Sequence, residues 1–311
     1  MKKCAIIYNP ESGKIKSKNW FDDKFNSVLN DYGYAPVYYP TKKRGDATEI
    51  ARTIENIDLL ICCGGDGTLN ETIRGNLKRK NKLLMAHLPF GTTNDVGAMY
   101  GYNKNHLGNL SMLLSGSKKK IDTCFINDRP FVYVACFGNY VDIAYNTPTE
   151  LKKKYGRFGY ILNALRQLRK KIRMYNVKFT IDGVERCGRY SFIFISNSSR
   201  IAGFDNVYKD VKLDDGKFEV LLCNFKNKKE LLKAFTLALT TELKNIEGIE
   251  YYCSDNLTLE FEKKPKVSWC IDGEELKSKS KKYEFKIVKD IKMLLPSKNI
   301  FKLFKNTKED V

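Results

Sequence analysis

The first third of the chain repeats one local pattern, in which a short apolar run is followed by a turn and then by a stretch with helical spacing. Short apolar runs bounded by Gly, Pro, Asn or Asp are typical of buried β-strands. Strands that alternate with helices favour parallel pairing, with the helices packed against the sheet. The pattern predicts strands at residues 4–8, 35–39, 59–63 and 83–88 and helices at residues 20–30, 46–56, 69–78 and 107–114.

From about residue 121 the chain consists mainly of short apolar runs separated by turn dipeptides such as Asp182-Gly183 and Asp272-Gly273. Such dipeptides are typical of β-hairpins and indicate antiparallel pairing. The predicted strands lie at residues 131–137, 177–181, 190–196, 217–224, 256–261, 267–271 and 283–288, and the predicted helices at 157–173 and 229–243. We therefore expect a three-layer α/β domain with a mostly parallel sheet over residues 1–121 and a β-sandwich-like domain over residues 122–290. Whether the tail at residues 291–311 packs back on the first domain is left open.

The densest group of informative residues is Gly64-Gly65-Asp66-Gly67-Thr68, which follows the third predicted strand and opens a predicted helix. Glycines let backbone N–H groups approach a phosphate, and the start of a helix adds unsatisfied donors and a positive dipole end. Thr68 is a suitable helix cap and phosphate contact, and Asp66 offers an oxygen ligand of the type that Mg²⁺ prefers. A purely structural turn is the alternative. The string matches neither the P-loop nor the Rossmann glycine pattern.

Three further turns follow predicted strands of the same sheet. They span residues 9–14, 41–47 and 88–95 and are rich in Gly, Pro, Thr, Asn and Asp. In an open parallel sheet the carboxyl ends of the strands line the ligand crevice. Each turn alone is weak evidence, but four at one sheet edge predict a nucleotide-binding site.

The net charge of +19 is concentrated in two segments. Residues 151–175 hold nine basic and no acidic residues, and residues 276–308 hold 11 basic and two acidic residues. A positive excess of this size is compatible with nucleic-acid binding. However, the basic residues of segment 157–173 lie among apolar residues at helical spacing, a pattern typical of helices that lie on anionic membranes. A core-packed helix with a solvated basic face is the alternative.

The cysteine and histidine content limits the chemistry. The nine cysteines contain no CxxC pair and lie mostly among apolar neighbours, so we expect buried, reduced thiols and neither disulfides nor a zinc site. The chain contains only two histidines, His87 and His106, so it offers few candidates for a histidine metal site or a Ser-His-Asp triad. The apolar neighbours of His87 favour a position in a strand over a catalytic role. The sequence contains no apolar run long enough for a transmembrane helix and no signal-peptide pattern at its first residues.

These motifs together resemble the diacylglycerol kinase catalytic-domain family of bacterial lipid kinases, which is related to sphingosine kinases. The resemblance covers most of the chain. It rests on Asn9-Pro10 with Ser12-Gly13, on residues 45–47, on residues 64–68 with Asn70-Glu71, and on the LPxGTTND string at residues 88–95. In the second half it rests on residues 153–160, on the Lys-Leu-Asp-Asp-Gly turn at residues 212–216, and on Asp272-Gly273-Glu274. The chain departs from the family at Lys209, where the family often has Pro, and at Ala202-Gly203, where it often has two glycines; both departures concern loops.

The resemblance implies roles for individual residues. Nucleotide contacts are implied for Asn9, Pro10, Glu11, Ser12, Gly13, Thr41, Gly64, Gly65, Asp66, Gly67, Thr68, Leu69, Asn70 and Thr92. An acidic network of Asp66, Asp95 and Asp122 would hold Mg²⁺, partly through water, and Glu274 would be the general base. A structural Mg²⁺ would be bound by the Asp215 side chain and the main-chain oxygens of Lys212 and Lys217.

The implied activity is that of an ATP- and Mg²⁺-dependent lipid kinase that transfers the γ-phosphate to a lipid hydroxyl, with diacylglycerol as the expected acceptor and phosphatidic acid as the product. The implied setting is the cytoplasm, with peripheral contact to an anionic membrane and no nucleic-acid partner; a homodimer is left open. Alternatives are a kinase of a sphingoid base or phosphatidylglycerol, or a non-catalytic protein that binds nucleic acid or membrane. An NAD kinase shares a similar glycine turn, but the LPxGTTND string and the Asp272-Gly273-Glu274 turn disfavour it.

Overall fold

The computed structural model describes residues 1–12, 15, 20–91, 94–139, 141, 171–200, 208, 210–238, 240–296 and 300–305. The chain divides into two compact units. Unit 1 contains Met1–Asp122 and Lys289–Val311, and unit 2 contains Thr123–Val288. Two strands, β5 (Ser117–Ile126) and β16 (Lys282–Leu295), have residues in both units.

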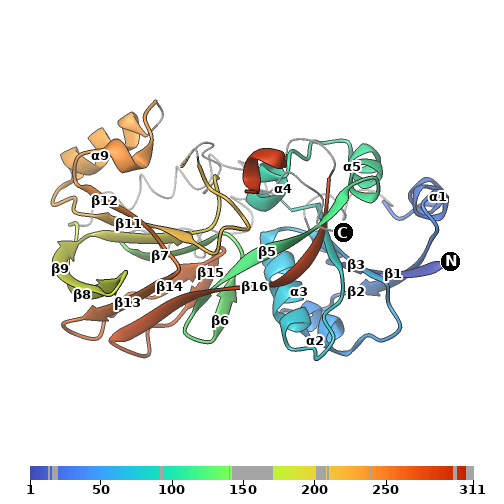
Figure 1. The fold of residues 1–311 in the computed structure, drawn as a ribbon, viewed down its shortest axis with the longest axis horizontal. Coiled ribbons are helices and arrows are strands. Elements are labelled where there is room, and N and C mark those ends of the chain that lie inside the picture. The colour runs from blue at the N-terminus through green and yellow to red at the C-terminus, as the bar shows by residue number, and fades with distance from the viewer. Residues whose placement is uncertain are drawn as a thin grey trace. The chain divides into compact units, whose positions relative to one another are not determined.

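Unit 1 is built around a parallel sheet with the order β2-β1-β3-β4 (Figure 1). These strands are β1 (Lys2–Tyr8), β2 (Tyr34–Pro40), β3 (Leu59–Gly64) and β4 (Met85–Pro89). The last part of β16 pairs with β4 in parallel at Met293 and Met85. All six residues of β3 are buried, as expected for a central strand with helices on both faces.

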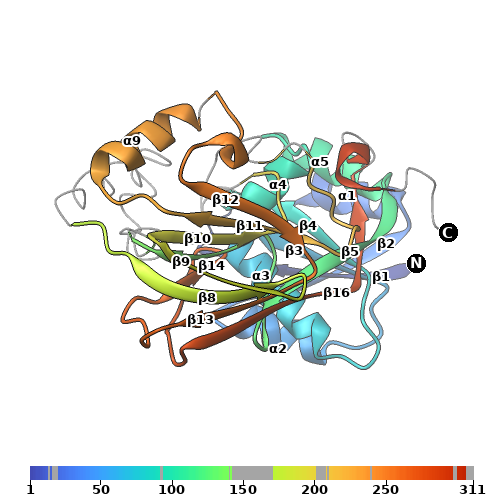
Figure 2. The same ribbon diagram turned by 60° about the vertical axis from the view of Figure 1, so that its left-hand side comes forward.

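Helices cover both faces of this sheet. Helices α1 (Asp23–Asp31) and α5 (His106–Leu114) lie on one face, and α2 (Asp46–Thr53) and α3 (Asp66–Leu77) lie on the other (Figure 2). The strand side chains alternate between the layers: Ile6 and Ile61 belong to the apolar cluster that contains Phe25 of α1 and Leu110 of α5. The predicted three-layer α/β fold is confirmed.

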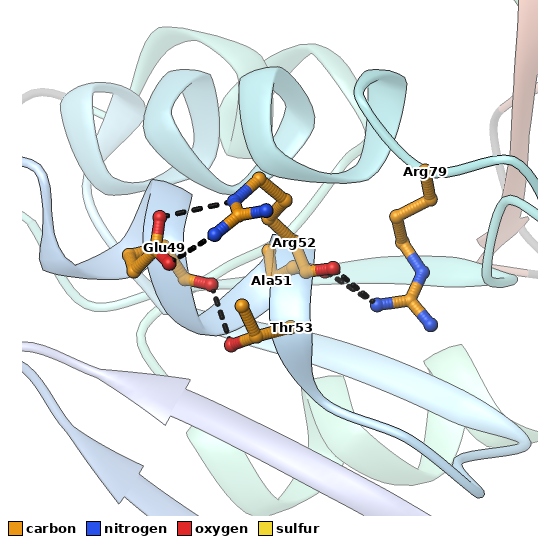
Figure 3. Close-up of polar contacts among 5 residues, drawn as sticks. All are labelled: Glu49, Ala51, Arg52, Thr53 and Arg79. Carbon is orange, nitrogen blue, oxygen red and sulfur yellow. Dashed lines mark hydrogen bonds and ion pairs between the residues drawn. The ribbon is translucent and has the colours of Figure 1, made fainter.

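The packing of α2 on α3 sets the position of the turn that precedes α2. A Cβ on Gly75 of α3 would lie 2.2 Å from the Thr48 carbonyl oxygen, so the two helices approach each other at a glycine. At the other end of α2, Arg79 donates hydrogen bonds from Nη1 to the carbonyl oxygens of Ala51 (3.1 Å) and Arg52 (2.9 Å), as Figure 3 shows. These carbonyls have no partner within their own helix, so Arg79 ties the end of α2 to the residues that follow α3.

Unit 2 contains two layers of antiparallel strands. One layer has the order β16-β13-β8-β9 and includes the β5–β6 hairpin; its other strands are β6 (Arg129–Phe131), β8 (Tyr175–Ile181), β9 (Val184–Tyr190) and β13 (Asn256–Phe261). The second layer has the order β12-β11-β10-β7-β14-β15, formed by β7 (Val134–Gly138), β10 (Phe192–Ser196), β11 (Phe218–Cys223), β12 (Ile249–Ser254), β14 (Trp269–Ile271) and β15 (Glu274–Leu276).

The core of unit 2 lies between its two layers. Alternate residues of the facing strands, such as Phe218 and Val220 of β11 and Leu257 and Leu259 of β13, fill it around the fully buried Trp269. The outer helix α9 (Lys228–Leu237) follows β11. The short 3₁₀ turns η2 (Leu243–Asn245) and η3 (Phe301–Leu303) belong to units 2 and 1 respectively. The predicted antiparallel, β-rich second domain is confirmed.

Several element boundaries differ from the prediction for identifiable reasons. The strand predicted at residues 131–137 is interrupted at residues 132 and 133, because the Asp272 carboxylate accepts hydrogen bonds from backbone N–H groups there. Strands β9 and β5 were not predicted, since the exposed residues of β9 and of the lysine-rich start of β5 give no apolar run. The helix predicted at residues 229–243 ends at Leu237.

The remaining sequence expectations concern cysteines, His87 and membrane spans. All nine cysteines are free thiols and seven of them are buried, as predicted. His87 lies in β4, also as predicted. Within the described residues, no helix combines the length and apolar composition needed to span a bilayer. The basic segment 157–173 lies outside the described residues, apart from its last three positions.

Candidate active site

Asp66 connects two of the predicted phosphate turns in unit 1. Helix α3 begins at Asp66 itself, three residues earlier than predicted, and Gly65 is its N-cap. The Asp66 carboxylate accepts hydrogen bonds from the backbone N–H groups of Asp95 (3.0 Å) and Val96 (3.2 Å), the first residues of α4 (Asp95–Met99). Thr68 therefore lies inside the first turn of α3, and the expectation that it caps the helix was wrong.

The two glycine turns touch through their backbones. A Cβ on Gly91 would lie 2.5 Å from the Cα of Gly65, a distance that real Cβ atoms do not adopt. The Phe90 N–H donates to the Gly64 carbonyl oxygen at 2.9 Å, and the Asn94 side-chain amide donates to the Gly91 carbonyl oxygen at 2.7 Å. Glycine is required at this contact because any side chain would separate the two loops.

The turn after β1 is held to the same edge. The side-chain oxygen of Asn9 accepts from the Glu11 N–H at 2.9 Å, which makes a compact turn, and Ser12 Oγ donates to the Phe90 carbonyl oxygen at 3.5 Å. Gly13 and Thr92, two of the predicted nucleotide contacts, lie outside the described residues.

The turn after β2 is tied to α3 by a glutamate. Glu71 is buried, and its Oε1 accepts from the Gly45 N–H at 2.9 Å, while the Thr48 hydroxyl donates to the Glu71 carbonyl oxygen at 2.9 Å. The Thr41 N–H donates to the Tyr8 carbonyl oxygen at 2.8 Å. The four turns are therefore linked, directly or through α3, at the carboxyl edge of one parallel sheet.

The predicted acidic residues of unit 1 differ in exposure. Asp95 and Asp122 are buried, with exposed fractions of 0% and 4%, whereas Asp66 is half-buried. Among the described residues, no group of three or more His, Cys, Asp or Glu side chains is arranged to hold a metal ion. The oxygen donors fit Mg²⁺ nevertheless, since this ion is usually held by one or two carboxylates together with phosphate oxygens and water. Leu69 and Asn70 are buried as well, so they support the turn from within the core.

Glu274, the predicted general base, lies in unit 2 at the start of β15. Its Oε2 accepts from Arg129 Nη2 at 2.8 Å, and both side chains are mostly buried, with exposed fractions of 16% and 21%. Asp272, two residues earlier, accepts from the N–H groups of Val132, Tyr133 and Val134 at 2.6–3.1 Å. Glu274 therefore lies in a hairpin that the hydrogen bonds of Asp272 hold in place, and its carboxylate is paired with Arg129.

The acidic turn after residue 211 is compact. The Asp215 side chain accepts from the Lys217 N–H at 2.9 Å. Glu219 follows in β11 with an exposed fraction of 4%, and burial, together with the negative charge of Asp215, raises its pKa to about 8. Lys209 and Ala202-Gly203, where the sequence departs from the family pattern, lie outside the described residues.

Sequence reasoning missed four residues that organise these sites: Glu71, Arg129, Glu219 and Asp272. Asp272 and Glu71 belong to motifs that the sequence did single out, and a carboxylate beside a turn is a common acceptor for backbone N–H groups. Arg129 carries no local signal, because its partner Glu274 is distant in the sequence, and the burial of Glu219 depends on the pairing of its strand with β10.

Comparison with known proteins shows which family the chain resembles in sequence and which structures share its fold. Residues 3–126 match the model of the diacylglycerol kinase catalytic domain. The chain is 35% identical over 239 residues to the diacylglycerol kinases of Staphylococcus aureus strains MRSA252 and Newman, a match that covers 76% of this chain and 75% of theirs. The crystal structure of a diacylglycerol kinase from Bacillus anthracis strain Sterne superposes with a TM-score of 0.72 at 20% identity, covering 94% of this chain and 97% of that one.

A second B. anthracis structure gives a TM-score of 0.77 at 22% identity, with the same coverage. At these identities the structural likeness concerns the fold, and the S. aureus relatives carry the assignment to a family. This chain belongs to the diacylglycerol kinase family of lipid kinases.

Proposed function

We propose that this protein transfers the γ-phosphoryl group of ATP to the hydroxyl group of diacylglycerol. The observation that carries the proposal is the contact between Gly65 and Gly91 beside the start of α3. It places bare backbone from two turns at a helix N-terminus, an arrangement that suits a polyphosphate. Family membership supports the use of ATP, and the acceptor rests on the names of the relatives alone.

In the proposed reaction the residues of unit 1 bind the nucleotide. The turns at residues 9–12, 41, 64–70 and 91 would surround the phosphates. Asp66, supported by the buried Asp95 and Asp122, would hold Mg²⁺ with phosphate oxygens and water. The bound ion would neutralise charge on the transferring phosphoryl group, which is the main requirement of such reactions.

Glu274 is the proposed general base in unit 2. It would accept the proton of the acceptor hydroxyl as the oxygen attacks the γ-phosphorus and the bond to ADP breaks. The ion pair with Arg129 fixes the position of the Glu274 carboxylate on β15. General-base assistance of this kind contributes roughly 10²–10⁴-fold to a rate.

Two further parts of the proposal concern metal and membrane. A structural Mg²⁺ would be bound at the turn of Lys212, Asp215 and Lys217.

The basic segments at residues 151–175 and 276–308 would bring the enzyme to an anionic membrane, where each basic residue near the surface contributes about 1 kcal/mol to binding. The concentration of positive charge in these segments supports membrane binding. A vesicle sedimentation assay tests it: the variant in which Arg166, Arg169, Lys170 and Arg173 are replaced by Glu should sediment less with anionic vesicles than the wild-type protein does.

A lipid panel with radiolabelled ATP tests the proposal. Diacylglycerol should be phosphorylated in preference to sphingosine, phosphatidylglycerol and NAD, and Glu274→Gln should lower kcat by at least about 100-fold. Glu275→Gln is the matched control, because the Glu275 side chain is exposed and accepts its hydrogen bond from Ser268. Preference for another acceptor would overturn the substrate, and full activity of Glu274→Gln would overturn the base.

A further inference from the structure

Three buried oxygen atoms of unit 2 make no hydrogen bond of normal geometry with the described residues, although the hydroxyl groups of Ser196 and Tyr208 are close enough to interact with each other. They are Oε2 of Glu219, the hydroxyl oxygen of Ser196 and the hydroxyl oxygen of Tyr208. The exposed fractions of these residues are 4%, 0% and 3%. Buried polar atoms are nearly always satisfied by protein, water or an ion, so this group of oxygens calls for an occupant.

The fold places these oxygens on the side of the second layer that faces away from the core. Phe218 and Val220 of β11 point into the core, so Glu219 between them points to the opposite side. Ser196 of β10 is the direct cross-strand neighbour of Glu219. Tyr208 lies on this side as well, because its ring centroid is 6.0 Å from that of Tyr251, a residue of β12 whose side chain is on the same side of the layer as Glu219.

The acidic turn adds a second carboxylate to this group. Asp215 lies in the turn that leads into β11, four residues before Glu219, and no basic side chain is paired with Glu219 in the described part of the chain. Two neighbouring carboxylates, one of them buried, repel each other unless a cation lies between them. Carboxylate, hydroxyl and carbonyl oxygens are the donors that a hard divalent cation prefers.

We propose that Glu219 is a ligand of a divalent cation at the Asp215 turn, so that the ion is anchored to strand β11 as well as to the turn. The inference rests on the structural Mg²⁺ proposed above and adds to it a buried carboxylate from the sheet. Ser196 and Tyr208 complete the oxygen surface around the ion. The cation then balances the two carboxylates and fastens the segment after residue 211 to the second layer.

The test measures thermal unfolding of the full chain, without nucleotide, in Mg²⁺ and in EDTA. Wild-type protein should unfold at a higher temperature in Mg²⁺. Glu219→Gln keeps the size and polarity of the side chain and should weaken the response to Mg²⁺ by roughly ten- to a hundredfold in concentration. Glu260→Gln, at an exposed glutamate of β13, is the control and should keep the wild-type response.

Direct binding provides a second readout. Tb³⁺ bound here should luminesce when tyrosine is excited, since Tyr208 and Tyr251 pack together on the same side of the layer as Glu219, and Mg²⁺ should displace it. Tyr208→Phe should weaken Tb³⁺ binding less than Glu219→Gln does. It is the substitute test variant if Glu219→Gln does not fold. Turnover is not a readout, so an error in the proposed lipid acceptor leaves the test unaffected.

The variants separate the possible failures. If Asp215→Asn abolishes the Mg²⁺ response while Glu219→Gln keeps it, the cation site exists without Glu219 and the inference is overturned. If neither variant changes the response, both the structural Mg²⁺ and the role of Glu219 are overturned.

Discussion

Asp66 accepts a hydrogen bond from the backbone N–H of Asp95 at 3.0 Å, so one carboxylate joins the turn after β3 to the turn after β4. The same carboxylate is the proposed ligand of the catalytic Mg²⁺. Its hydrogen bonds to the start of α4 orient it before any ion binds, and the ion in turn would hold both turns in register. This double role makes Asp66 the residue whose replacement should affect both stability and activity.

We expect Asp66→Asn to lower turnover by roughly 100-fold or more, the effect of removing one group that stabilises charge in a transition state. Because an amide has only one acceptor oxygen, it should also cost about 1–2 kcal/mol of unfolding free energy. Kinase assays and urea denaturation measure the two effects. Asp58→Asn is the control, since Asp58 also accepts from a backbone N–H, that of Lys3, but precedes β3. Wild-type turnover of Asp66→Asn would contradict the proposed role.

Arg129 should act through Glu274. Removal of the guanidinium in Arg129→Met leaves a mostly buried carboxylate with one partner fewer, so we expect kcat to fall by about tenfold or more, the scale of rate loss when a catalytic group is misplaced, with a smaller change in KM. Arg129→Lys should recover part of the loss because it restores the charge. Steady-state kinetics of both variants measure this, with the exposed Arg186→Met as control. A change in KM alone would assign Arg129 to substrate binding.

Gly67 offers a way to detect bound phosphate. It lies in the first turn of α3, and a Cβ there would meet no protein atom within 4 Å. Gly67→Ala should therefore raise the unfolding free energy by about 0.5–1 kcal/mol, the usual gain of Ala over Gly in a helix. If the phosphates lie against this turn, the same variant should bind ATP more weakly. Calorimetry measures the affinity of Gly67→Ala for ATP. An affinity equal to that of the wild-type protein would mean that the phosphates do not lie against this turn.

Gly75 should show the opposite effect on stability. A Cβ on Gly75 would lie 2.2 Å from the Thr48 carbonyl oxygen and 2.8 Å from the Ala51 Cβ, so Gly75→Ala must push α2 away from α3. Overpacking of this kind typically costs about 1–3 kcal/mol. Urea denaturation should show the loss. A neutral result would mean that α2 shifts without cost.

His87 should make the protein less stable in mild acid. Burial lowers its pKa to about 4 from the usual 6.5, so between these values the unfolded chain binds a proton that the folded chain does not. The unfolding free energy should therefore fall as the pH drops from about 6.5 to about 4, by at most about 3 kcal/mol, and then level off. In His87→Gln this component should disappear, which urea denaturation across this pH range can test. An unchanged pH profile would assign the acid sensitivity to other groups.

The sequence predicted the elements of unit 1 well because their signal is local. The apolar runs of β1, β3 and β4 are long enough to identify buried strands, and each is followed by a turn with a distinctive composition. Prediction was poorer for β9 and β12, which lie at sheet edges and carry exposed or half-exposed residues. An edge strand is defined by the neighbour with which it pairs, and that neighbour is distant in the sequence.

The same distinction holds for the candidate site. The identity and order of Asp66, Asp95 and Glu274 are properties of the sequence, as are the glycines that permit close backbone contact. The contact of Gly65 with Gly91, the pairing of Arg129 with Glu274 and the burial of Glu219 opposite Ser196 arise only when the strands pair. Local composition determined which groups can bind phosphate and metal. Tertiary structure decided which of them meet, because hydrogen bonds and charge interactions depend on distances that strand pairing and helix packing create.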